Sequence, residues 1–216
     1  MPLRSFHGVT GRAHLTREDC GWLARQEGFA GELVFDGRFF EWRRSIDYQP
    51  KSVRADAGAL DWEGEVLVER GRDVDYLEHW HQEALETAAP TCALELRRRD
   101  TRVSAQLLRI GNVFMLARDR EASAPGGRTL LDCVMSASSR GEAQQLVDCE
   151  IAFGAVRDGQ YRILASTLPW RIGEPLAPRW VGDAVELADR SPEGRPLTPT
   201  WDIVRADGQA QDLSAA

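Results

Sequence analysis

The stretch Phe40-Glu41-Trp42-Arg43-Arg44-Ser45-Ile46-Asp47-Tyr48 decides the fold, because its apolar and polar residues alternate. Aromatic or aliphatic side chains stand at even positions: Phe40, Trp42, Ile46 and Tyr48. Such alternation is typical of a β-strand with one buried and one solvated face. Arg44 interrupts the apolar face, and a charge at such a position is costly unless it is paired or used. The stretch therefore predicts the wall of a β-barrel with a polar feature inside.

The same parity continues into the segments that follow. We predict that the even-numbered residues of those segments face the interior that Phe40 and Trp42 line: Leu60, Trp62, Val66, Val68, Tyr76, Glu78 and Trp80. Glu78 is then a second charge on the apolar face. The composition of residues 75–89 also suits a helix, but we prefer a strand through about Gln82.

Short strands separated by turns predict an all-β protein. The Asp-Gly pairs at 36–37 and 158–159 favour tight hairpins, and hairpin-length gaps favour antiparallel meanders over βαβ units. Closing such a sheet into a barrel removes its edges. The expected strands are 32–35, 38–47, 58–63, 65–69, 93–97, 103–109, 113–118, 129–136, 145–157, 161–166, 184–187 and 200–205. A helix is expected over 16–28, with Thr16 as its N-cap.

A repeated pattern predicts two related halves. Leu33 to Gly37 followed by Phe40 and Arg44 matches Leu107 to Gly111 followed by Phe114 and Arg118, at a constant offset. We place the junction near Pro90, which gives a first lipocalin-like barrel or half at 1–90 and a second at 91–216. One barrel or two remains open from the sequence.

Composition excludes several classes of function. The 216 residues are 43% hydrophobic and 28% charged, as in ordinary globular proteins, and the net charge of −7 argues against nucleic acid as a partner. No apolar run is long enough to span a membrane. The N-terminus lacks the apolar core of a secretion signal, and the four cysteines are widely spaced. Reduced thiols and a cytoplasmic location are expected.

One family shares short motifs with this chain. Residues 55–60 carry an Asp/Gly segment, residues 67–71 end in a Glu-Arg-Gly turn, and Asp75-Tyr76-Leu77-Glu78-His79-Trp80 follows. These segments, together with Leu107 to Gly111, resemble the fungal protein HRI1 family, over about a third of the chain. The resemblance implies a pair of lipocalin-like barrels and no particular chemistry. The strand at Trp42-Arg43-Arg44 and the residues His79 and His81 depart from the family pattern.

The interior residues predict a small-molecule pocket. We expect these residues to line it: Trp42, Arg44, Tyr48, Trp62, Tyr76, Glu78 and Trp80. Aromatic walls suit an apolar ligand, and Arg44 or Glu78 would fix its polar or acidic group. The simpler alternative is that the aromatic residues pack a filled core in which Arg44 pairs with Glu78.

Two other functions remain open. In a cofactor-free isomerase or cyclase, Glu78 and Tyr76 would act as acid and base. In a protein-interaction module, the barrels would be filled and the surface would recognise a protein. No cofactor motif is present, and His79 and His81 have no third ligand at a metal-binding spacing, so neither a metal nor a cofactor is expected. A monomer and a dimer are equally compatible with the sequence.

Overall fold

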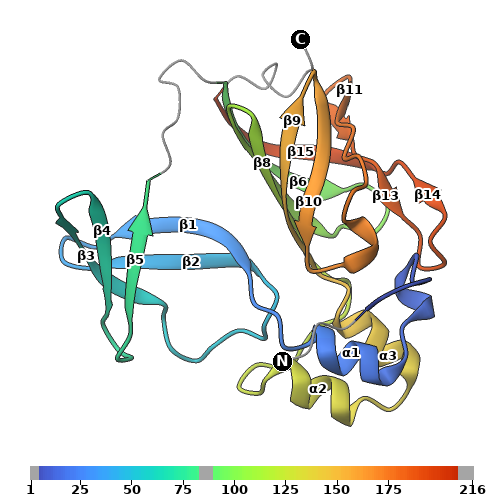
Figure 1. Cartoon of the computed structure of the whole chain (residues 1–216), viewed down its shortest axis with the longest axis horizontal. Coiled ribbons are helices and arrows are strands. Elements are labelled where there is room, and N and C mark those ends of the chain that lie inside the picture. The colour runs from blue at the N-terminus through green and yellow to red at the C-terminus, as the bar shows by residue number, and fades with distance from the viewer. Residues whose placement is uncertain (1–4, 83–89, 209–216) are drawn as a thin grey trace.

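The chain folds into two curled antiparallel sheets and three short helices (Figure 1). A computed structural model describes residues 5–82 and 90–208. The all-β, lipocalin-like class that the alternation predicts is confirmed. Each sheet is a curled half-barrel.

The first sheet is a simple meander in the order β1-β2-β3-β4-β5. Its strands are β1 (Phe29–Phe35), β2 (Phe40–Asp47), β3 (Ala57–Glu63), β4 (Val66–Gly71) and β5 (Leu77–His81). The strand interpretation of β5 is correct, although the strand begins at Leu77 and not at Asp75. Consecutive strands pair throughout, as short hairpin connections require.

The second sheet has the order β10-β9-β8-β7-β6-β15-β12-β11. Its longer strands are β6 (Thr91–Arg98), β7 (Ser104–Ile110), β8 (Val113–Arg118), β9 (Glu150–Arg157), β10 (Gln160–Ser166) and β15 (Thr200–Gly208), joined by the short β11 (Arg179–Val181) and β12 (Ala184–Glu186). The pairing of β15 with β6 brings the two ends of this half together. β13 (Asp189–Arg190) and β14 (Pro196–Leu197) form a separate small sheet.

The inner face of the second sheet carries a filled apolar core. Phe114, Leu107 and Trp201 are almost completely buried in one cluster with residues from all of its longer strands. The hairpin between β9 and β10 turns at Asp158 and Gly159, with φ of 48° and 69°. Two consecutive positive φ values are what a type I′ turn requires, so this Asp-Gly prediction is confirmed.

Two segments that we expected to be strands are helical. α2 (Leu130–Ser136) replaces the strand expected over 129–136. α3 (Arg140–Leu146) covers the first two residues of the strand expected over 145–157, and β9 forms most of its remainder. Each helix begins with a side-chain cap: Thr129 accepts from the amide of Asp132, and Ser139 accepts from the amide of Glu142. This capping spacing was the sequence signal for a helix that the strand interpretation overlooked.

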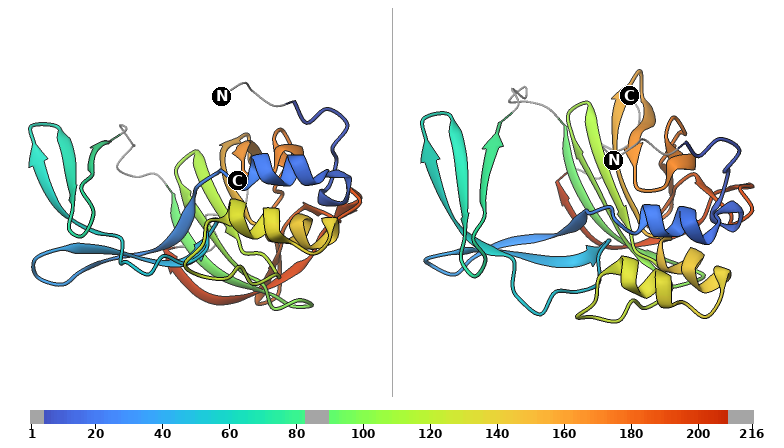
Figure 2. Two further views of the ribbon diagram at one scale, coloured as in Figure 1. Left: turned by 90° about the horizontal axis from the view of Figure 1, so that it is seen from below. Right: turned by 60° about the horizontal axis from the view of Figure 1, so that its bottom comes forward.

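α1 (Arg17–Leu23) packs against α2 and α3 at one end of the molecule (Figure 2). Thr16 caps α1 as expected, but the helix ends at Leu23, before Gly28. Two 3₁₀ turns, η1 (Arg12–His14) and η2 (Pro169–Arg171), complete the described elements. The boundary after residue 90 stays a prediction: the first sheet precedes it and the second sheet follows it, while α1 packs on helices from the later half.

The four cysteines are free and buried. Cys20, Cys133 and Cys149 lie in the core around the three helices, and Cys92 lies in the core of the second sheet. None of the helices in the described part of the chain has the length and apolar character needed to cross a membrane.

Candidate functional site

The register of the first sheet puts most of the predicted pocket residues on one face. Trp62 pairs with Leu67, which pairs with Trp80. Leu60 pairs with Glu69, which pairs with Glu78. Directly opposed residues point to the same face of a sheet. Parity therefore holds for β3 and β5, and His79 and His81 lie on the opposite face.

Parity fails in β4. The hairpin between Glu63 and Val66 has two intervening residues, so each even-numbered residue of β3 faces an odd-numbered residue of β4. Leu67 and Glu69 thus lie on the face where we expected Val66 and Val68. Glu69, which the sequence interpretation missed, is 1% exposed.

A bulge in β2 changes parity a second time. Ala30 of β1 pairs with Ile46 of β2, but the next residue, Gly31, pairs with Arg44. Ser45 of β2 is therefore left unpaired. Ile46 therefore lies on the other face, and Asp47 joins Arg44.

Tyr48 follows that change of face and is absent from the predicted pocket. It is fully buried in the core around the helices, where its hydroxyl donates to the carbonyl of Leu23 at 3.1 Å. Its assignment to the ligand pocket is corrected accordingly. Trp62 faces the expected way but is 61% exposed near the β3–β4 hairpin.

Seven side chains of the first sheet and its loops form a closed ring of contacts, which we call the polar–aromatic ring: Phe29, Trp42, Trp80, Glu69, Tyr76, Asp56 and Arg44. Four of these, Trp42, Arg44, Tyr76 and Trp80, were predicted pocket residues. Phe29, Asp56 and Glu69 were not predicted, because their places depend on the bulge, a loop and the hairpin register.

The aromatic side of the ring shows how strongly the sheet curls. The ring centroids of Trp42 and Trp80 are 5.9 Å apart, although β3 and β4 separate their strands within the sheet. Phe29 meets Trp42 edge-on with centroids 5.6 Å apart. The face that carries the ring is therefore concave.

The polar side of the ring is a chain of hydrogen bonds. The indole of Trp80 donates to Oε2 of Glu69 at 3.1 Å, and the hydroxyl of Tyr76 lies 2.8 Å from Oε1 of the same carboxylate. The Tyr76 hydroxyl also lies 3.4 Å from Oδ1 of Asp56. Burial, followed by the hydrogen bond to Glu69, raises the pKa of Tyr76, so this residue remains a neutral donor.

Arg44 closes the ring on the opposite side from Glu69. Its guanidinium forms ion pairs with Asp56 and, at 3.1 Å, with Asp47, and it lies 3.9 Å above the Phe29 ring. The predicted pairing of Arg44 with Glu78 is not formed. Arg44 is thus already neutralised by two carboxylates within the described residues.

Glu78 lies on the same face but outside the ring. Desolvation, reinforced by the nearby charges of Glu69 and Asp56, raises the pKa of Glu78, while Arg44 opposes the shift. Tyr76 is hydrogen-bonded to Glu69, and Glu78 is exposed beside this pair. The catalytic role of Glu78 and Tyr76 stays a prediction.

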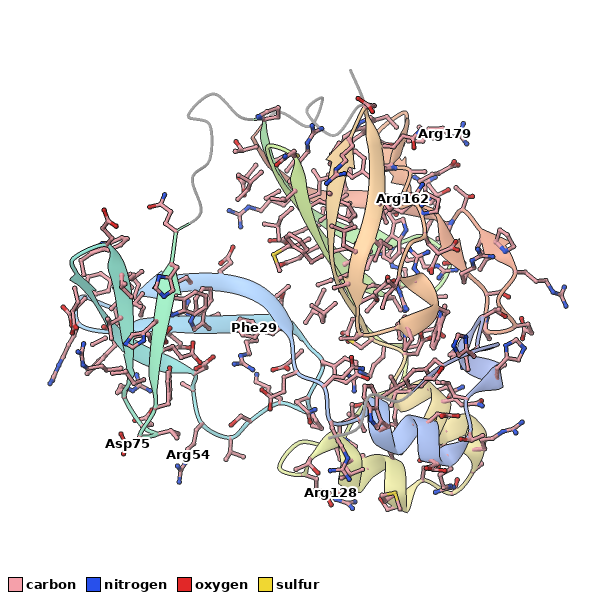
Figure 3. The ribbon with its side chains drawn as sticks, in the orientation of Figure 1. Phe29, Arg54, Asp75, Arg128, Arg162 and Arg179 are labelled. Carbon is pink, nitrogen blue, oxygen red and sulfur yellow. The ribbon has the colours of Figure 1, made fainter. Side chains whose placement is uncertain are left out.

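An open cavity of about 1090 Å³ adjoins the ring. Trp42, Arg44 and Asp56 contribute to its wall, and residues 49–56 and 119–124 form the rest together with neighbouring side chains such as Val74. Arg54 and Asp75, labelled in Figure 3, mark the two loops at this end of the first sheet. The volume lies slightly above the range of about 300–1,000 Å³ that is typical of small-molecule sites.

No protein-family model, curated protein or solved structure matches the chain. Among residues 5–82 and 90–208, no group of three or more His, Cys, Asp or Glu side chains has the geometry of a metal site.

Proposed function

We propose that this protein binds an apolar small molecule with a polar group on the concave face of its first sheet. The observation that carries the proposal is the polar–aromatic ring beside a cavity of about 1090 Å³. Trp42 offers an apolar wall, and the partly buried hydrogen-bonded chain from Trp80 to Asp56 offers fixed polar atoms, which is the combination that small-molecule sites use. Buried, free cysteines support a reducing location such as the cytoplasm as part of this proposal. We also propose that the chain belongs to a protein HRI1-like family of lipocalin-like barrels, on the motifs in residues 55–80 and 107–111.

Native mass spectrometry of protein purified from its own host tests this function. A non-covalent adduct that is lost in the denatured mass is the expected result, and its loss in a Trp42→Ala variant would locate the ligand. Val181→Ala is the control, because Val181 is exposed on β11 and does not line this cavity. Protein that carries no adduct and stays empty after soaking in a varied apolar library would contradict the proposal.

The second candidate function is that of a cofactor-free isomerase or cyclase whose active site lies on the same face. The raised pKa of Glu78 favours it, because desolvation and the neighbouring carboxylates shift this group toward its protonated form, as general acid–base catalysis requires. In that case Glu78→Gln abolishes turnover of the retained molecule while its binding survives. Equal turnover by wild-type protein and the variant would exclude this role.

A protein-recognition role would use another surface. Leu108, Met115 and Phe153 oppose one another across β7, β8 and β9. They are exposed on the outer face of the second sheet, away from its apolar core. This third hypothesis would be favoured over ligand binding by two results together. The first sheet would bind no small molecule, and a protein partner would protect these residues from hydrogen exchange.

A further inference from the structure

One arginine in the wall of the cavity is buried with a hydrogen-bond donor unused. Arg120 lines the cavity of about 1090 Å³ and is 8% exposed. Its Nη2 donates to the backbone carbonyl of Asp47 at 3.1 Å and to that of Tyr48, whereas its Nη1 has no hydrogen-bond partner among the described residues. A buried charged donor without an acceptor is costly, so this position favours an acceptor supplied by a ligand.

The immediate surroundings of Arg120 leave its charge uncompensated. Within residues 5–82 and 90–208, the guanidinium forms no ion pair with a carboxylate. The neighbouring group is the thiol of Cys149. Burial raises the pKa of Cys149 to about 11, although the charge of Arg120 opposes the shift. The thiol therefore stays neutral, and a neutral sulfur is only a weak acceptor.

The loop that follows β2 brings a second cation to the same end of the cavity. Lys51 is the only lysine of the chain, and it lines the wall with Arg120. It forms no ion pair in the part of the chain that the structure describes. Gln49 anchors this loop, because its Nε2 donates to the carbonyl of Ala24 at 3.0 Å and its Oε1 accepts from the amide of Leu130 at 3.1 Å. Both cations are thus carried by segments fixed at the ends of α1 and α2.

The total charge of the wall does not select a ligand, because basic and acidic side chains line it in equal number. Three of the carboxylates already pair with Arg43 or Arg44. Of the others, Glu121 is exposed, and Asp119 accepts from the backbone amide of Arg120 at 2.8 Å. The selection therefore comes from the free donors at the loop end of the cavity and not from a charge balance.

We propose that the polar group of the ligand is a carboxylate that accepts from Arg120 and Lys51, while the apolar part of the ligand extends along β2 toward Trp42. This inference rests on the proposed binding function and specifies the ligand class and its anchor. It differs from the expectation that Arg44 meets the acidic group, because Arg44 is already paired with two carboxylates.

The cavity favours an elongated ligand with a single negative charge. Trp42 and Arg120 line the same cavity, and Arg120 contacts the backbone of Asp47 at the far end of β2. At about 3.3 Å per residue, roughly 15 Å of strand separates Trp42 from Asp47. The carboxylate of Asp119 adjoins the anchor and would repel a second negative charge, so a carboxylate fits this end better than a phosphate dianion.

Charge-matched probes test the inference. Decanoate, decan-1-ol, decylamine and decyl phosphate share one chain, and 4-(2-naphthyl)butanoate with its alcohol and amine repeats the series on an aromatic scaffold. Titration calorimetry with the full chain should show each carboxylate binding about tenfold more tightly than its alcohol. Each amine and the phosphate should bind more weakly than the carboxylate, and added salt should weaken carboxylate binding.

Variants connect that preference to the anchor. The readout is the ratio of carboxylate affinity to alcohol affinity, because a residue that only supports the fold changes both affinities alike. Arg120→Gln should lower this ratio about tenfold and Lys51→Gln about threefold. Asp119→Asn should raise it about threefold, because it removes the nearest negative charge and keeps the oxygen that accepts from the Arg120 amide. Arg157→Gln is the matched control, since Arg157 is exposed on β9 and outside the cavity wall.

Failure of the inference and failure of the proposed function give different results. An alcohol, amine or phosphate that binds as tightly as its carboxylate would overturn the carboxylate assignment and leave the pocket in place. A ratio unchanged in both Lys51→Gln and Asp119→Asn would also overturn it, and this holds even if Arg120→Gln does not fold. Wild-type protein that binds no member of either series would overturn the proposed function and the carboxylate assignment together.

Discussion

Tyr76 and Glu69 form a hydrogen bond of 2.8 Å on the concave face of the first sheet, with the glycine pair Gly58 and Gly71 directly behind them. Glu69 is the most buried charged group of that sheet, and its other oxygen accepts from Trp80. The bond connects the loop before β5 to the middle of the sheet. It therefore links the stability of the sheet to the geometry of the proposed site.

Replacing Tyr76 by Phe tests the strength of this bond. The variant leaves one oxygen of a buried carboxylate without its donor, so we expect the free energy of unfolding to fall by about 1.5–3 kcal/mol. Urea unfolding measures it. Tyr48→Phe is the matched control, because Tyr48 donates to a neutral carbonyl, and we expect a loss of about 0.5–1.5 kcal/mol. A smaller loss at Tyr76 than at Tyr48 would contradict a charge-assisted bond.

Gly71→Ala tests the close approach of the backbone to Tyr76. The new Cβ would lie 2.2 Å from the carbonyl oxygen of Val74 and 2.5 Å from the Tyr76 ring, so the segment from Val74 to Tyr76 must move. We expect this movement to weaken the bond from Tyr76 to Glu69. We expect a loss of about 1–3 kcal/mol of stability, typical of overpacking. Gly141→Ala is the control in α3, where the nearest atom is 3.9 Å away. It should stabilise by about 0.5–1 kcal/mol, and destabilisation of both variants alike would argue against a specific clash.

Glu78→Gln tests the raised pKa of Glu78. The folded protein favours the protonated form, so the contribution of Glu78 to the free energy of unfolding is fully present below the ordinary pKa of glutamate. That contribution is lost as the pH rises through the raised pKa. We therefore expect the variant to melt at a higher temperature than wild-type protein at pH 7.5 and to show no such gain at pH 4. The facing groups Glu69, Asp56 and Arg44 remain in both proteins. An equal shift at both pH values would show that the effect is not electrostatic.

Thr129→Ala tests the helix that the strand interpretation missed. The hydroxyl of Thr129 accepts from the amide of Asp132, and Asp132 returns a hydrogen bond to the cap, so the variant should lose about 1 kcal/mol. Chemical denaturation measures the loss. Thr101→Ala is the control in the β6–β7 turn, where no side-chain cap is formed. Equal effects of the two substitutions would contradict the capping role.

The sequence predicted the elements whose signals are local. Alternation identified β2, β3 and β5, the Asp158-Gly159 pair identified a hairpin, and Thr16 identified the start of α1. Each depends on a few neighbouring residues and on steric or hydrogen-bonding preferences that act within one element. α2 was missed because its short apolar run fits the spacing of a helix as well as that of a buried strand. Only the Thr129 cap distinguishes the two.

The site required information that no single strand contains. Trp42, Arg44, Tyr76 and Trp80 were predicted, because each lies on the expected face of its own segment. Glu69 and Tyr48 were placed on the wrong faces for two reasons. A two-residue hairpin exchanges odd and even positions across strands, and an unpaired Ser45 shifts alternation within one strand.

The amino-acid sequence by itself determined which segments are strands and which side chains within a segment share a face, since both follow from local backbone geometry. Only the tertiary structure decided that Trp42 meets Trp80 and that Glu69 lies between Trp80 and Tyr76. Those contacts join residues from strands that are not neighbours or depend on register. They are set by how strongly the sheet curls, which is a property of all five strands packed together.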